Sequence, residues 1–219
     1  MKRISLFLNR LREVRHATGT LRALLIAPLW LVCRRHVVLE MEIRPPVIER
    51  MEKDPEIEWR QLCETEVAPL FEMNPSLEPD LVATRFREGQ TLFACLIEGR
   101  IVHYRWYASK RSWLPFLRLG WEPEEGDYTV VGAYTPPQER NRGVNTAVVR
   151  QGLERAGAMG YQRVVSFIAE WNTPSLKATR RGGLRPIGTV TLWTLGIAHW
   201  HTSTGRVRVE GATVRVPTP

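Results

Sequence analysis

The chain has 219 residues, 43% of them hydrophobic and 25% charged, which predicts one globular domain with a substantial core and excludes a fibrous or low-complexity protein. Residues 1–36 hold eight basic residues and one acidic residue, a charge of +7, so the total of +8 leaves +1 for the rest of the chain. The basic character therefore belongs to an N-terminal extension, and no nucleic-acid partner is predicted because its arginines form no recognisable binding module.

The extension, residues 1–36, has two parts. As far as Arg15, apolar residues recur at helical spacing among basic ones, which is a basic amphipathic pattern. Residues 23–33 then form an apolar run that is too short for a membrane-spanning helix, which needs about 20 residues. No cleavage site of a secretory signal follows this run.

Two interpretations of the extension stay open. In the first, a helix lies on the inner face of a membrane, and its basic side chains contact anionic headgroups. In the second, the helix packs on the domain or on a second subunit, as in a homodimer. The sequence thus predicts a cytoplasmic protein. Under the first interpretation, this protein is a peripheral one on the inner face of the membrane. The dispersed cysteines Cys33, Cys63 and Cys95 agree with a reducing compartment and predict neither disulfides nor a metal site.

In the first half of the domain, which we expect to run over 37–216, the sequence predicts one strand, two helices and a β-hairpin. Residues 37–43 are rich in β-branched side chains and predict a strand, whereas 56–72 have apolar residues at helical spacing. A second helix is predicted from Ser76, as its cap, to residue 88. Residues 91–97 and 101–107 are two apolar runs joined by a short Gly-containing turn, the signal of a β-hairpin.

The second half predicts a strand at 127–135, a helix at 144–159, a strand at 163–170 and a helix at 174–181. Gly160 is the expected C-cap of the longer helix. Three further strands are predicted at 184–195, 197–201 and 206–216, followed by a disordered tail, 217–219. His199 and His201 share one strand face, but no third ligand accompanies them, so no metal is predicted.

The loop that joins the strand at 127–135 to the next helix carries the strongest functional signal. It reads Arg140-Asn141-Arg142-Gly143-Val144-Asn145-Thr146. The first amides of a helix lack intrahelical partners and the helix dipole adds to their attraction for anions, so this loop predicts a phosphate-binding site. Downstream landmarks follow at fixed spacing: Asn172, Ser175, and the pair Gly183-Leu184.

Together with Ala133, Thr135 and Pro137, these residues resemble the GCN5-related N-acetyltransferase family, whose pyrophosphate loop has the pattern Q/R-x-x-G-x-G/A. The resemblance implies an α/β (α+β) fold with a mixed, splayed central sheet flanked by helices. It also implies acetyl-CoA, or another acyl-CoA, as the donor and no metal. Helices between the first two strands of the family border the acceptor site.

The resemblance assigns the coenzyme A contacts by position. The amide of Ala133 would stabilise the oxyanion, and Thr135 would contact the pantetheine through its main chain. Asn172 and Ser175 would lie near the thiol end of coenzyme A or simply cap a helix. The pyrophosphate would be bound by the loop residues Arg140, Asn141, Arg142, Gly143, Val144, Asn145 and Thr146. Asn141 and Asn145 replace small residues of the family pattern, and only Asn141 is an easy replacement because asparagine tolerates left-handed geometry.

The catalytic groups are less well defined. Many family members have a tyrosine where this chain has Thr179, and a threonine hydroxyl is far too weak an acid to protonate a thiolate. Two candidate general bases are Asp127, on the strand face used by some family members, and His103, in the hairpin. Each also has a structural interpretation, as a strand-start residue and as a core histidine.

The resemblance, together with the anion site, implies an acyl-CoA-dependent N-acyltransferase that moves an acyl group, most simply acetyl, to an amine by direct attack in a ternary complex. The acceptor is expected to be a small-molecule or envelope-linked amine. Two alternatives stay open: a non-catalytic acyl-CoA-binding or membrane-docking module with the same fold, and an acyltransferase for lipid-linked or cell-envelope substrates that the extension reaches.

Overall fold

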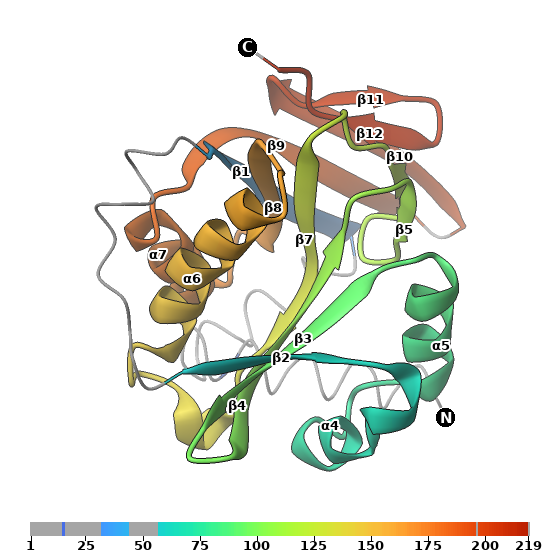
Figure 1. Cartoon of the computed structure of the whole chain (residues 1–219). Coiled ribbons are helices and arrows are strands. Elements are labelled where there is room, and N and C mark those ends of the chain that lie inside the picture. Colours follow the sequence, from blue (N-terminus) through green and yellow to red (C-terminus); the bar gives the residue numbers. More distant parts are fainter. Residues whose placement is uncertain (1–14, 16–31, 44–56, 196, 219) are drawn as a thin grey trace.

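The computed structural model describes residues 15, 32–43, 57–195 and 197–218, which form two sheets with helices on both faces of the larger one (Figure 1). The larger sheet has the strand order β10-β9-β1-β8-β7-β4-β3-β2. Its strands are β1 (Cys33–Glu42), β2 (Glu58–Leu62), β3 (Thr91–Ile97), β4 (Arg100–Ala108), β7 (Asp127–Tyr134), β8 (Arg163–Ala169), β9 (Arg185–Leu195) and β10 (Ala198–Gly205). Strands β7 and β8 are parallel and the other neighbours antiparallel, so the sheet is mixed, as predicted.

The smaller sheet has the order β11-β12-β6-β5. Its strands are β5 (Ser112–Leu114), β6 (Leu119–Trp121), β11 (Arg208–Glu210) and β12 (Thr213–Arg215). The helices are η1 (Glu64–Glu66), α4 (Ala68–Met73), α5 (Pro79–Arg87), η2 (Pro137–Glu139), α6 (Val144–Ala158) and α7 (Thr173–Arg181).

Two hydrophobic cores form because alternate residues of a strand point to opposite faces of the sheet. On one face, α6 and α7 cover the sheet, with Val148 and Leu153 of α6 among the fully buried side chains. On the other face, α4, α5 and the smaller sheet cover it, with Trp106 and Trp121 completely buried. Each face therefore has its own layer, and the sheet separates them (Figure 1).

Several predicted elements are confirmed. The hairpin forms from β3 and β4, and Glu98 and Gly99 both have positive φ, as a tight hairpin turn of two residues requires. Helix α6 begins at Val144 as predicted and ends at Ala158, and Gly160 follows it with φ +86°.

The helix predicted over 56–72 is wrong in its first half. Residues 58–62 form β2, an edge strand that pairs antiparallel with β3. Trp59 and Leu62 are buried and three residues apart, which imitates a helical stripe, while Arg60 and Gln61 between them are exposed. The backbone hydrogen bonds that β3 offers decide the structure here. Only η1 and α4 remain of the predicted helix.

The helix predicted from Ser76 begins later. Glu78 is the N-cap of α5 and makes no side-chain capping bond, and Pro79 is the first helical residue. Ser76 instead donates its amide to the side chain of Asn74, at 3.2 Å. A proline at the first position of a helix fixes φ where no amide partner is needed, so it sets the start in place of a capping side chain.

The C-terminal segment also differs from the prediction. Residues 206–216 do not extend the larger sheet but form β11 and β12 of the smaller one. The tail is held rather than disordered as far as Thr218: the amide of Thr218 donates to Glu124 at 3.0 Å, and the carbonyl of Pro217 accepts from Arg163 at 3.4 Å.

Strand β1 lies between β8 and β9 and begins at Cys33, four residues before the expected start of the domain. Its residues Val38 and Leu39 have no exposed surface. Of the predicted extension, 1–14 and 16–31 lie outside the described residues. Among the helices described, none is long and apolar enough to cross a membrane. A deletion that tests the extension must end before Cys33, because a longer one removes part of the sheet.

Candidate functional site

The candidate site begins where β7 separates from β8. The two strands pair only from Asp127 to Val130, although β7 continues beside β4 to Tyr134. A bulge at Val131 marks the separation, since Val130 and Gly132 lie opposite consecutive residues of β4. Within the described structure, the β8-facing edge of β7 therefore has no strand partner beyond Val130, and Ala133 on this stretch is exposed. The sheet is splayed, as predicted.

The loop between η2 and α6 comes soon after this unpaired edge in the chain. Asn141 and Gly143 have φ values of +64° and +77°, so the chain turns twice through the left-handed region before the helix. Asparagine and glycine are the residues that occupy this region most readily. In the described chain, the amides of Gly143, Val144 and Asn145 donate to no backbone carbonyl, whereas Thr146 donates to the carbonyl of Gly143 at 3.0 Å. The free amides and the α6 dipole together form an anion-binding helix start.

The side chains around this loop are mostly cationic. Arg142 pairs with the buried carboxylate of Glu139 at 2.6 Å, and Arg100, from the start of β4, approaches the same carboxylate at 3.4 Å. Arg140 donates through Nε to the carbonyl of Thr135 at 2.9 Å, and its guanidinium lies 5.9 Å from the ring centre of Tyr134. The loop arginines are therefore ordered by the protein itself, and Glu139 offsets only part of their charge.

Asn145 points into the protein rather than over the loop. Its Oδ1 accepts a hydrogen bond from Arg105 of β4 at 3.0 Å, and Arg105 is 6% exposed. The Nε of Arg105 has no partner among the described residues. The side chain of Asn145, which is larger than the glycine or alanine of the family pattern, is thus accommodated by its hydrogen bond with the buried guanidinium of Arg105. Arg105 had no sequence signal apart from its place two residues after His103 on the same face of β4.

We expect Asn145→Ala to lower the free energy of unfolding by about 1–3 kcal/mol, because it leaves a buried N–H of Arg105 unpaired. Urea denaturation measures this change, with Thr146→Ala on the same helical turn as the control. The double variant Arg105→Met/Asn145→Ala should be less destabilised than the sum of the single variants, since it removes both polar partners. Strict additivity would show that the contact contributes nothing.

His103 lies on β4 beside the end of β7. It is 1% exposed, and its Nδ1 is 2.7 Å from Oγ1 of Thr135. Burial, followed by the nearby charge of Arg105, lowers the pKa of His103 well below its usual range, so the imidazole is neutral at pH 7. The fold thus brings together His103, a candidate base, and Thr135, an expected pantetheine contact.

The lowered pKa of His103 predicts a loss of stability in acid. Below a pH of about 6.5 the unfolded chain binds a proton at this histidine and the folded chain does not, so the free energy of unfolding falls by about 1.4 kcal/mol per pH unit. This decrease continues until the pH reaches the lowered pKa of the folded state. Urea denaturation from pH 5 to 8 should show a steeper dependence in the wild type than in His103→Gln, in which His201, whose pKa is also lowered by burial, still contributes. Parallel curves for the two proteins would contradict it.

Asp127 lies at the opposite end of β7 from Ala133. Its two carboxylate oxygens bind Arg163 at 2.6 and 2.7 Å, and one of them also accepts the amide of Glu124 at 3.0 Å. Asp127 is 2% exposed. The structure thus favours the strand-start interpretation of this residue over catalysis, because its charge is already used by the buried arginine.

Asn172 is the N-cap of α7, and its side chain accepts the amide of Ser175 at 3.3 Å. Asn172 therefore caps α7, in agreement with the capping interpretation. It follows β8, the strand from which β7 separates, whereas Ser175 lies in the first turn of α7. Thr179, at the position of the family tyrosine, is 4% exposed. Its hydroxyl is short and enclosed, so the structure supplies no acid at this point of α7.

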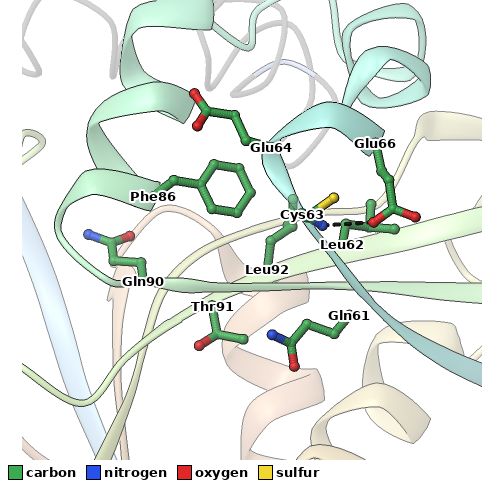
Figure 2. A pocket seen from close by; sticks show the side chains of 9 residues that line it. All are labelled: Gln61, Leu62, Cys63, Glu64, Glu66, Phe86, Gln90, Thr91 and Leu92. Atoms are coloured by element: carbon green, nitrogen blue, oxygen red, sulfur yellow. Dashed lines mark hydrogen bonds between the residues drawn. The ribbon is translucent and has the colours of Figure 1, made fainter.

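A separate open pocket of about 370 Å³ lies at the edge of the sheet, where the end of β2 and the start of β3 meet α5 (Figure 2). Figure 2 shows Phe86 between α5 and the chain at Cys63, with Glu64 and Gln90 on the same rim. None of the predicted coenzyme A residues lines this pocket, so it is distinct from the loop site.

Comparison with solved structures defines the class of fold. The chain is similar to a GCN5-related N-acetyltransferase from Kribbella flavida, with 15% identity, 82% of this chain and 65% of that chain covered, and a TM-score of 0.51. It is also similar to AAC(6')-Ib in complex with paromomycin and acetyl-CoA, with 15% identity, 69% and 94% coverage, and a TM-score of 0.50. The chain spans 53 to 63% of the length of several other matched structures.

No protein-family model matches the sequence, and no curated protein does. The structural likeness is nevertheless to the family that the loop and its landmarks resemble. The chain has the fold of the GCN5-related N-acetyltransferases.

Proposed function

We propose that the protein transfers an acyl group, most simply acetyl, from coenzyme A to an amine. The observation that carries this proposal is the succession of two features along the chain: the unpaired edge of β7 is followed, after the single turn of η2, by the loop whose amides are free at the start of α6. An extended pantetheine arm fits an open strand edge through main-chain hydrogen bonds, and a pyrophosphate fits a helix start. One ligand that carries both groups matches this arrangement.

The proposed donor contacts follow the chain. The main chain of Ala133 and Thr135 binds the pantetheine, and the amides of Gly143, Val144 and Asn145 bind the pyrophosphate. The positive charge of Arg140 and Arg142 adds to this attraction. Arg105 supports the site from below, because it holds Asn145 at 3.0 Å and contributes a buried charge beneath the loop.

In the proposed reaction, the free amine attacks the thioester carbonyl, and the amide of Ala133 stabilises the oxyanion that forms. The carbon–sulfur bond then breaks, coenzyme A leaves as a thiolate, and the amine proton is lost. Of the two candidate bases, His103 is the less committed, because its Nε2 has no partner among the described residues whereas Asp127 binds Arg163; its lowered pKa, however, makes it a weak base. We assign no general acid, because Thr179 is too weak an acid and is enclosed.

Isothermal titration with two donors tests the binding step. We expect acetyl-CoA to bind in the micromolar range and S-acetyl-pantetheine, which lacks the pyrophosphate, to bind at least about 30-fold more weakly, a difference of about 2 kcal/mol. Absence of acetyl-CoA binding at millimolar concentration would overturn the proposal. Release of coenzyme A in the presence of a broad amine panel then tests the chemistry.

A second candidate function is an acyl-CoA-binding module without catalysis. The enclosed Thr179, in place of a phenol, favours this candidate. Tight binding of acetyl-CoA without release of coenzyme A in any amine mixture would support it. Amine-dependent release of coenzyme A would exclude it.

A further inference from the structure

Arg85 lies on the face of the sheet opposite α6, against the part of β7 that separates from β8. It belongs to the last turn of α5, and its NH2 group donates to the carbonyl of Val131, the bulge residue, at 3.2 Å. Its guanidinium lies 5.2 Å from the ring centre of Trp106. A Cβ at Gly132 would overlap the guanidinium, so the glycine allows this close approach.

The charge of Arg85 has no carboxylate partner among the described residues. Glu88 influences it only from a distance and receives hydrogen bonds from Gln90 and from the amide of Trp113 instead. Burial lowers the pKa of Arg85 to about 10, so it stays protonated at pH 7. Arg163, by contrast, is a buried arginine with paired carboxylates. A guanidinium that is largely withdrawn from water and lacks a counter-ion is well prepared to bind an anion.

The position of Arg85 indicates which anion this is. Arg105 and Ala133 are register partners on β4 and β7, and Arg105 reaches the start of α6 on one face. Arg85 contacts the neighbouring residues, Val131 and Gly132, from the other face. A donor whose phosphates lie at α6 brings its acyl group to the unpaired edge between these faces. Arg85 is therefore placed to bind an anionic group that approaches the acyl group from the α5 side of the sheet.

We propose that Arg85 binds a carboxylate that lies next to the reacting carbonyl. This assignment rests on the proposed acyl transfer and names its substrate class. The carboxylate belongs either to the acceptor, as in an amino acid, or to a dicarboxylic acyl group on the donor, as in succinyl-CoA. The planar fork of the guanidinium suits a carboxylate, and one of its N–H groups is fixed by Val131.

Two experimental arms distinguish these sources. The first measures release of coenzyme A from acetyl-CoA with a mixture of amino acids and with the matched amino-acid amides, which lack the carboxylate. The second measures the affinities of succinyl-CoA and of butyryl-CoA, a neutral acyl group of the same chain length, by isothermal titration. We expect a preference of at least about tenfold for the carboxylate in one arm.

The variants Arg85→Gln and Arg85→Lys complete the test. Glutamine removes the charge and should abolish the preference, while lysine keeps the charge and should retain part of it. No preference in either arm, or a preference that survives in Arg85→Gln, overturns the assignment. A wild-type chain that fails to bind acetyl-CoA overturns the proposed acyl transfer and this assignment with it, whereas binding without carboxylate preference overturns the assignment alone. Melting temperatures identify a variant that fails to fold, and Arg85→Lys then decides.

Discussion

Replacing Arg163 with methionine should lower the free energy of unfolding by about 3–5 kcal/mol, the usual cost of leaving one partner of a buried ion pair uncompensated. Arg163 is 3% exposed and binds Asp127 through two nitrogens, at 2.6 and 2.7 Å. It also donates to the carbonyl of Val216 at 2.8 Å and lies 3.4 Å from Glu40. The one side chain therefore connects β8, β7, β1 and the C-terminal tail.

Urea denaturation of three proteins tests this prediction. Arg163→Met alone should show the full loss, and Arg163→Met/Asp127→Leu should recover part of it, because no uncompensated carboxylate remains on β7. Arg215→Met, which removes a 2.8 Å ion pair with Glu122 at the surface, is the control and should cost far less than Arg163→Met, because water screens an exposed ion pair. Equal losses for Arg163→Met and Arg215→Met would show that the buried network is not important for stability.

Replacing Gly143 with glutamate should weaken acetyl-CoA binding at least about 100-fold. A carboxylate placed about 6 Å from a phosphate repels it by about 3 kcal/mol at an effective dielectric constant of 20. Gly143 is the N-cap of α6, and apart from its chain neighbours no atom of the described residues lies within 4 Å of a Cβ built there, so the added Cβ has room. Its φ of +77° adds a strain of about 1 kcal/mol to any non-glycine residue.

Gly143→Gln separates the charge from the backbone strain. It carries the same strain and nearly the same volume as glutamate but no charge, so we expect it to lose less than about tenfold in affinity. Isothermal titration with acetyl-CoA measures both variants, and urea denaturation should show similar stabilities. Equal affinities for the two variants would mean that the phosphates do not lie at the start of α6.

Local signals in the sequence were sufficient to predict part of this structure. The hairpin of β3 and β4 follows from two apolar runs and a glycine turn, and α6 follows from its periodicity and from Gly160. The anion-binding loop could be predicted for the same reason, because Asn141 and Gly143 are residues that tolerate positive φ next to a helix start. Such conformations depend on the residues themselves and on their nearest neighbours.

The remaining features could not be predicted in this way, because each depends on partners that are distant in the chain. Residues 58–62 became an edge strand because β3 offered hydrogen bonds, although Trp59 and Leu62 have helical spacing. Asp127 changed from a candidate base to an ion-pair partner because Arg163, 36 residues later, lies beside it. On the two faces of the splayed strand, Arg105 binds Asn145 and Arg85 binds the bulge residue Val131. No local sequence pattern indicates either contact. The sequence could therefore locate an anion-binding loop, but the charges that surround it are brought together only by packing of the sheet.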